Sequence, residues 1–156
     1  MNKVILILST SGTSNEAIEF AVKEAKERNS SLLALYIIET GLTNELFDRF
    51  TDIGFIGDKP SSDLVEAVQK EYRQRGYEEI GKAQVRAMEE SVNFDAVTLQ
   101  GEFLKEAEKA IDEHDASLVV AVRKKKHSFL KYFSRSLADE LKKRSKVEVI
   151  IFNEEG

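Results

Sequence analysis

The sequence contains no cysteine and no tryptophan, and its 156 residues include one proline and two histidines. Without cysteine, the chain has no disulfide framework, no thiolate-ligated metal site and no cysteine nucleophile. The two histidines, His114 and His127, are far apart in the sequence. We therefore expect a protein of a reducing compartment, located in the cytoplasm, with no metal site.

Long apolar runs are also absent. The amino-terminal run Val4 to Leu8 is too short for a signal-peptide core and far below the roughly 20 residues of a membrane span. We expect no membrane span and a single domain over residues 1–156, because a chain of this length can bury its own core.

Charge is distributed unevenly along the chain. Residues 123–146 carry ten Lys or Arg but only two acidic residues, whereas the chain as a whole has a formal net charge of −5. One basic segment on an acidic body indicates a local anion site or a charge-complementary partner more than general nucleic-acid binding. A solvated helix face is the plainer interpretation of the same segment.

Five short apolar runs predict strands. Most are continuously apolar rather than alternating, which is typical of parallel strands that are covered on both faces. They are Lys3 to Leu8, Leu32 to Ile38, Ala96 to Leu99, Leu118 to Val122 and Val147 to Phe152.

Helical patterns separate these runs. Thr13 and Glu16 predict a capping box for the first helix, and Asn29 predicts its left-handed end. A second, long helix is expected from about Asp63 to Glu90, weakened by its glycines. Its apolar positions include Leu64, Val68, Tyr72, Ile80 and Met88, the third helix carries Phe103, Leu104, Ala107 and Ile111, and the fourth carries Phe129, Phe133, Leu137 and Leu141.

Strands that alternate with helices predict an α/β fold with an open parallel sheet and helices on both faces. One connection, Thr40 to Ser62, exceeds twenty residues. Connections of that length are usually functional or contain structure of their own. A short helix around Asn44 to Phe50 that packs as a lid or against a partner is one interpretation, and local core filling is the other.

In such a sheet, ligands bind beyond the carboxyl ends of the strands, where the strand order reverses. Two loops are expected to meet there. One is the hydroxyl-rich run Ser9 to Thr13, which leads into a helix whose free N–H groups favour anions. The other is the basic run Arg123 to His127.

The layout resembles the universal stress protein family, of the single-domain, adenine nucleotide alpha hydrolase-like type, over essentially the whole chain. The resemblance rests on the strand at Lys3 to Leu6 with its Ser/Thr-rich loop, on Glu16 to Ala21, on Gly101-Glu102, and on Ser136 to Leu141 followed by Val147 to Ile151. It implies a Rossmann-like, five-stranded parallel sheet with strand order 3-2-1-4-5, and a homodimer that pairs through the last strand at Val147, Val149 and Ile151.

Family members that bind ATP resemble one another in a phosphate loop of three glycines followed by Ser or Thr. Here those glycines align with Val122, Lys125 and Arg135, and only the hydroxyl remains, as Ser136. Side chains at these positions would fill the space in which backbone N–H groups approach phosphate. The family's early acidic residue aligns with Ser9 or Thr10.

These departures make the nucleotide site degenerate, so we expect no cofactor other than a possible ATP. If it binds anything, the candidate ligand-binding residues are Ser9, Thr10, Ser11, Val122, Lys125, Arg135 and Ser136.

Three functions follow from this interpretation. The first is a non-enzymatic cytoplasmic homodimer in stress response or regulation, with an unidentified protein partner and without the family's standard ATP binding. The second is a sensor of ATP or another small anionic ligand, held by lysine charge rather than by backbone N–H groups. The third is a module whose basic face docks on an acidic protein, membrane or nucleic acid through Lys142, Lys143, Arg144 and Lys146.

No catalytic arrangement stands out. The acidic residues have the spacing of exposed helix faces, and the chain has no G-x-S-x-G, Walker or intact G-x-G-x-x-G motif. A phosphate-accepting receiver domain is excluded because it needs acidic residues where this chain has Ser9-Thr10 and Gln100-Gly101.

Overall fold

The chain forms one five-stranded parallel sheet in the order β3-β2-β1-β4-β5. The computed structural model describes residues 2–9, 13–39, 62–123 and 137–154, with backbone alone for 62–65. The observed order confirms the predicted 3-2-1-4-5 arrangement. The strands are β1 (Lys3–Ser9), β2 (Ser31–Glu39), β3 (Phe94–Gly101), β4 (Ala116–Arg123) and β5 (Val149–Asn153).

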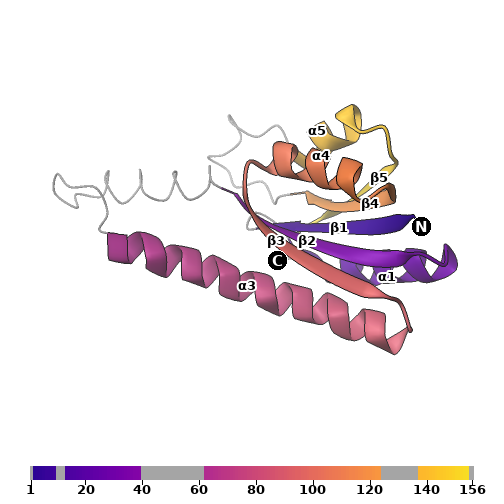
Figure 1. Cartoon of the computed structure of the whole chain (residues 1–156), viewed down its shortest axis with the longest axis horizontal. Coiled ribbons are helices and arrows are strands. Elements are labelled where there is room, and N and C mark those ends of the chain that lie inside the picture. Colours follow the sequence, from indigo (N-terminus) through magenta and orange to yellow (C-terminus); the bar gives the residue numbers. More distant parts are fainter. Residues whose placement is uncertain (1, 10–12, 40–61, 124–136, 155–156) are drawn as a thin grey trace.

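Helices cover both faces of this sheet (Figure 1). α1 (Asn15–Glu27) and α3 (Ser62–Glu89) lie on one face, and α4 (Phe103–Glu113) and α5 (Leu137–Arg144) lie on the other. The chain therefore winds outward from β1 in both directions, which places the reversal of strand order between β1 and β4.

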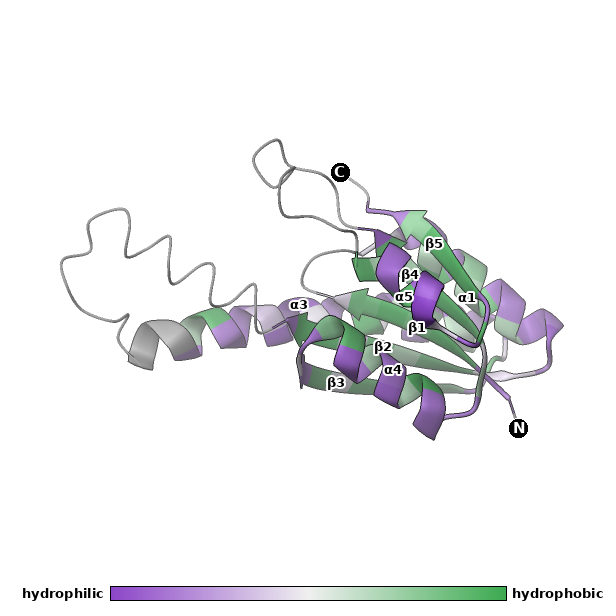
Figure 2. Cartoon of the chain, turned by 90° about the horizontal axis from the view of Figure 1, so that it is seen from above, coloured by the Kyte–Doolittle hydropathy of each residue, from purple (hydrophilic) through white to green (hydrophobic). Residues whose placement is uncertain are grey.

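Two hydrophobic clusters, one on each face, form the core. Alternate residues of one strand enter different clusters: Val4 and Leu6 face α1 and α3, whereas Ile5 and Ile7 face α4 and α5. The apolar strands therefore lie between helices whose outer surfaces are largely polar (Figure 2). Continuous apolar runs in β1, β2 and β4 follow directly from this burial on two faces.

The long helix α3 lies close to the sheet at Gly76. A Cβ atom added there would lie 2.8 Å from Cδ1 of Tyr36, a side chain on β2 that is 1% exposed. Burial raises the pKa of Tyr36 to about 12, so its hydroxyl stays protonated at neutral pH. A second glycine of the same helix, Gly81, has no neighbouring atom within 4 Å of such a Cβ.

Ion pairs join α1 to the end of α3. The Arg86 guanidinium donates to both carboxylate oxygens of Glu19, at 2.6 and 2.8 Å, and to Glu89 at 2.6 Å. Lys26 pairs with Glu90 at 2.6 Å. The hydrogen bond from Arg86 lowers the pKa of Glu19, and the one from Lys26 lowers the pKa of Glu90. These exposed pairs fix the relative register of the two helices more than they add stability.

Several element boundaries differ from the sequence predictions. β3 is longer than predicted, and β5 begins at Val149 rather than Val147. Val147 lies before the strand because the Ser145 hydroxyl accepts from its N–H at 3.0 Å and donates to its carbonyl at 2.9 Å. Met88, predicted as an apolar position of the long helix, is 69% exposed, because a helix of 3.6 residues per turn places it away from the inward face of α3. That inward face includes Gly76, Ala83 and Ala87.

The left-handed end of α1 at Asn29 is confirmed by its φ of 52°. Two other predictions lie outside the described residues: the short helix at Asn44 to Phe50, and the aromatic positions Phe129 and Phe133 of the last helix.

Replacing each glycine of α3 by alanine separates helix propensity from packing. Gly81→Ala should stabilise the protein by about 0.5–1 kcal/mol, because alanine restricts the unfolded chain and meets no neighbour. Gly76→Ala should destabilise it by about 1–3 kcal/mol, because the Tyr36 ring is fixed in the core. Urea unfolding of both variants measures the difference, and equal stabilisation by the two would contradict this packing.

Candidate functional site

The strand order reverses between β1 and β4, whose carboxyl ends lie at the same edge of the sheet. The two strands pair in parallel, with Val4 beside Leu118 and Leu6 beside Val120. β1 ends at Ser9 and β4 ends at Arg123. In an open α/β sheet this reversal opens a crevice at the carboxyl edge, and ligands of such folds bind there.

Two of the predicted site residues lie at these strand ends. Ser9 is 5% exposed and Val122 is 8% exposed. Val122 packs in the cluster that the sheet shares with α1 and α3. The side chain of Val122 therefore belongs to the core, at a position where the family resemblance places a glycine.

The other predicted site residues lie outside the described part of the chain. These are Thr10, Ser11, Lys125, Arg135 and Ser136. Their assignment to a nucleotide site therefore stays a prediction, as does that of Ser9 and Val122.

α1, the helix that follows β1, is capped one residue later than predicted. Ser14, not Thr13, is the N-cap of α1, and its hydroxyl accepts from the N–H of Ala17 at 3.2 Å. The third residue after this cap is Ala17, so no carboxylate completes a capping box. Ser14 is buried, which places the start of α1 firmly against the sheet.

At the end of β4, the Arg123 guanidinium is engaged by three oxygen atoms. It donates from Nε to Oδ2 of Asp139 at 2.9 Å and from Nη2 to Oδ1 of the same residue at 2.6 Å. A third bond runs from Nη1 to Oδ1 of Asn153 at 3.1 Å. The hydrogen bond with Asp139 raises the pKa of Arg123, so this group remains charged. We call these three residues the Arg123 junction.

The Arg123 junction joins three elements at the carboxyl edge. Arg123 ends β4, Asn153 is its neighbour across the ladder on β5, and Asp139 lies in the first turn of α5. The backbone continues this link, because the N–H of Glu154 donates to the Arg123 carbonyl at 2.9 Å. Sequence reasoning assigned Arg123 to a basic run and missed its partners, which are 16 and 30 residues away.

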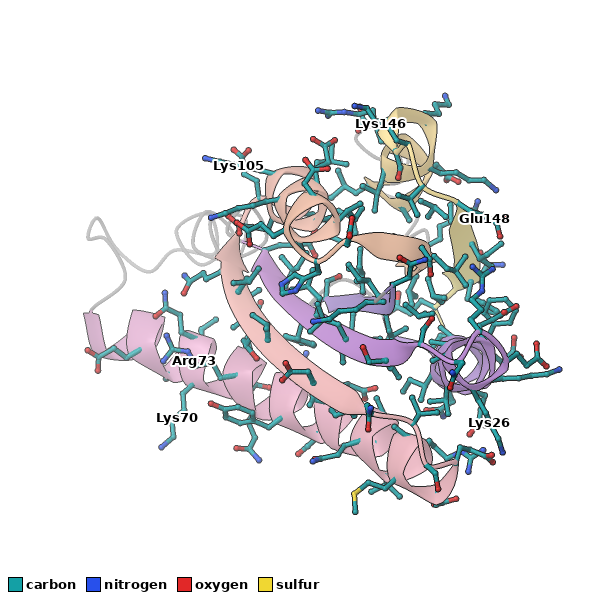
Figure 3. The ribbon with its side chains drawn as sticks, turned by 45° about the vertical axis from the view of Figure 1, so that its right-hand side comes forward. Lys26, Lys70, Arg73, Lys105, Lys146 and Glu148 are labelled. Atoms are coloured by element: carbon teal, nitrogen blue, oxygen red, sulfur yellow. The ribbon has the colours of Figure 1, made fainter. Side chains whose placement is uncertain are left out.

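α5 is held in place by packing and by a second ion pair. Ala138 and Leu141 are buried against the sheet. Arg144 lies with Nε 2.9 Å from Oε1 of Glu108 on α4. One cation of the predicted basic face is therefore neutralised within the domain. Figure 3 shows Lys146 and Lys105 on the same side of the sheet.

β5 is an edge strand of the described sheet, so among the described residues one side of its backbone has no neighbouring strand. The Glu148 carbonyl and the Glu154 N–H are hydrogen-bonded to β4. Successive residues of a strand direct their backbone N–H and C=O groups to opposite sides, so those of Val149, Ile151 and Asn153 face the open edge. The side chain of Val149 is 2% exposed and packs in the α4/α5 cluster. A partner strand could therefore bind here through the backbone rather than through this side chain.

Two further features bear on function. No helix in the described segments is long and apolar enough to cross a membrane. Within the same segments, no three His, Asp or Glu side chains gather as a metal-binding group.

The fold defines a doubly wound α/β protein whose strand order reverses between β1 and β4. The model of the universal stress protein family matches residues 1–153, so the chain belongs to that family. This confirms the resemblance inferred from the sequence.

Solved structures of other universal stress proteins share the fold. UspA from Lactobacillus plantarum is 15% identical, with a TM-score of 0.70 and 97% of each chain covered. A universal stress protein from Archaeoglobus fulgidus, solved in complex with dAMP, is 15% identical, with a TM-score of 0.60 over 97% of each chain. Another, in complex with cAMP, is 17% identical, with a TM-score of 0.60 over 97% of each chain. A search of curated proteins finds no match.

The position of the α1 cap can be tested by two adjacent substitutions. Ser14→Ala should lower the free energy of unfolding by about 1 kcal/mol, because it removes the acceptor of the Ala17 N–H. Thr13→Ala should change it by less than about 0.5 kcal/mol. Chemical denaturation measures the free energy of unfolding of both variants. A larger decrease in the Thr13 variant would contradict Ser14 as the cap and support Thr13, which the sequence predicted.

Proposed function

We propose that this universal stress protein is a non-enzymatic regulatory module of the cytoplasm that acts as a homodimer in the stress response, without the family's standard ATP binding. The observation that carries this proposal is the Arg123 junction. At the edge where the family's ligand site is expected, the cation at the end of β4 is already bound by a carboxylate and an amide of the same chain.

The chemistry of the neighbouring positions supports the loss of ATP binding. Ser9 stands where the family's resemblance places an acidic residue, and it offers no fixed charge. Val122 brings a buried side chain to a position where the family's loop has glycine. Backbone approach to phosphate and an acidic contact would both be weakened by these changes.

A second candidate is a sensor of ATP or another small anion. Two structural relatives were solved in complex with dAMP and cAMP, which favours a retained nucleotide site. In this chain the phosphates would be held by the charges of Lys124, Lys125 and Lys126 rather than by backbone N–H groups.

A third candidate is the basic-face module. Lys142, Lys143 and Lys146 are exposed, but Arg144 is paired with Glu108, and Asp139 and Glu140 lie on the same short helix. The basic face is thus smaller than the sequence predicts, and this function has less support than the first two.

Thermal unfolding in the presence of nucleotides separates the first two candidates. The first predicts no change in Tm with ATP, ADP, AMP or cAMP beyond that caused by sulfate at equal ionic strength. A nucleotide at about 100 times its Kd would add roughly 2.7 kcal/mol of stability, or several degrees. A rise of that size with ATP and not with sulfate would replace the first candidate by the sensor. Nucleotide that copurifies with the protein would do the same.

The homodimer is tested at the free edge of β5. Light scattering at micromolar concentration should give twice the chain mass of 17.6 kDa. Ile151→Pro removes an N–H that faces this edge and should shift the protein to monomer. Thr98→Pro is the matched control, because Thr98 is exposed on β3, the opposite edge strand, and its N–H faces away from β2. This variant should remain a dimer.

A monomeric wild-type protein would contradict the dimer. A dimer that persists in the Ile151 variant would contradict pairing through β5, provided that circular dichroism shows both variants folded.

A further inference from the structure

Asp139 holds the Arg123 guanidinium in the geometry that a phosphate group would use. Both carboxylate oxygens are engaged, at 2.6 and 2.9 Å, by two different nitrogens of the guanidinium. Bidentate binding of this kind is how arginine recognises carboxylates and phosphates alike. The carboxylate is therefore an intramolecular equivalent of a ligand anion at the end of β4.

The pair is reachable from solvent, so its role is unlike that of a core ion pair. The Arg123 side chain is 37% exposed and that of Asp139 is 41% exposed. Ion pairs with this exposure contribute little to stability, because solvent screens them. In contrast, a half-exposed guanidinium at the carboxyl end of β4, next to the reversal of strand order, is accessible to an anion in solution.

The location of Asp139 on α5 keeps its carboxylate beside the Arg123 guanidinium. It lies in the first turn of the helix, where a carboxylate is favoured by the helix dipole. α5 is itself anchored by the burial of Ala138 and Leu141 and by the pair between Arg144 and Glu108. The carboxylate is thus presented to Arg123 by a fixed element.

We propose that Asp139 is a specificity-determining residue: it occupies Arg123 and keeps phosphate-bearing anions from binding at the carboxyl end of β4. This inference rests on the proposed loss of ATP binding and gives it a cause within the described residues. Asn153, which is neutral, positions the guanidinium without competing as an anion. Removal of the Asp139 charge leaves Arg123 with an amide partner and an open bidentate face.

The test is the affinity of the full chain for inorganic pyrophosphate, measured by isothermal titration calorimetry at constant ionic strength. Asp139→Asn should bind pyrophosphate about tenfold more tightly than the wild type, because one negative charge close to the bound anion is lost. Glu140→Gln is the matched control: it removes an equal charge from the next residue of α5 and should leave the affinity unchanged.

The double variant Arg123→Gln with Asp139→Asn should lose the gain, because the cation that binds the anion is absent. Three results would overturn the proposal: no gain in the Asp139 variant, an equal gain in the Glu140 variant, or a gain that persists in the double variant. Asp139→Ser replaces Asp139→Asn if the latter does not fold, as judged by circular dichroism.

The wild-type titration with ATP keeps this inference distinguishable from the proposed function. If wild-type protein binds ATP, the proposed function is wrong. If it does not, and Asp139→Asn gains nothing, the loss of ATP binding stands and its cause is not Asp139.

Discussion

Burial of the central strands on both faces is the constraint on which the rest of this structure depends. Strands β1, β2 and β4 carry apolar side chains in both directions, so neither face can be left to water. Helices must therefore cover both sides, and the chain must wind in two directions from β1. This winding reverses the strand order between β1 and β4. In open α/β sheets, ligands bind beyond the carboxyl ends of the strands at such a reversal.

This architecture is shared across the universal stress protein family. The fold is shared with proteins solved with dAMP and cAMP, but at 15% and 17% identity this likeness extends to the fold alone. What the present chain does depends on the residues at its carboxyl edge. There the Arg123 guanidinium donates hydrogen bonds to Asp139 and Asn153, and these contacts join β4, β5 and α5.

The α/β class could be predicted from the sequence because most strands are continuous apolar runs and α1 and α4 carry apolar stripes. The strand order was implied by the family resemblance instead. One detail that failed depends on contacts between distant residues. Thr13 and Ser14 are both good caps, and burial of Ser14 decides between them. Met88 continues the four-residue spacing of Tyr72 and Ile80, but that spacing drifts around a helix of 3.6 residues per turn, so Met88 lies away from the inward face of α3.

The candidate site was less predictable than the fold. Family resemblance aligned Val122 with a glycine of the phosphate loop, yet nothing in the sequence connects Arg123 with Asp139 and Asn153. Their contact requires the parallel register of β4 with β5 and the return of α5 over the sheet. Long-range pairs of this kind have no local signal, because many acidic residues in a chain with 28 of them could be the partner.

The most direct measurement of the central claim is the NMR signal of the Arg123 Nε–H in protein labelled with ¹⁵N at arginine, assigned through the Arg123→Gln variant. In the wild type this signal should remain unmoved by millimolar ATP, because Nε donates to Asp139 in the free protein and continues to do so. A saturable shift of the signal with ATP, and not with sulfate, would show that the nucleotide displaces the carboxylate and would contradict the account.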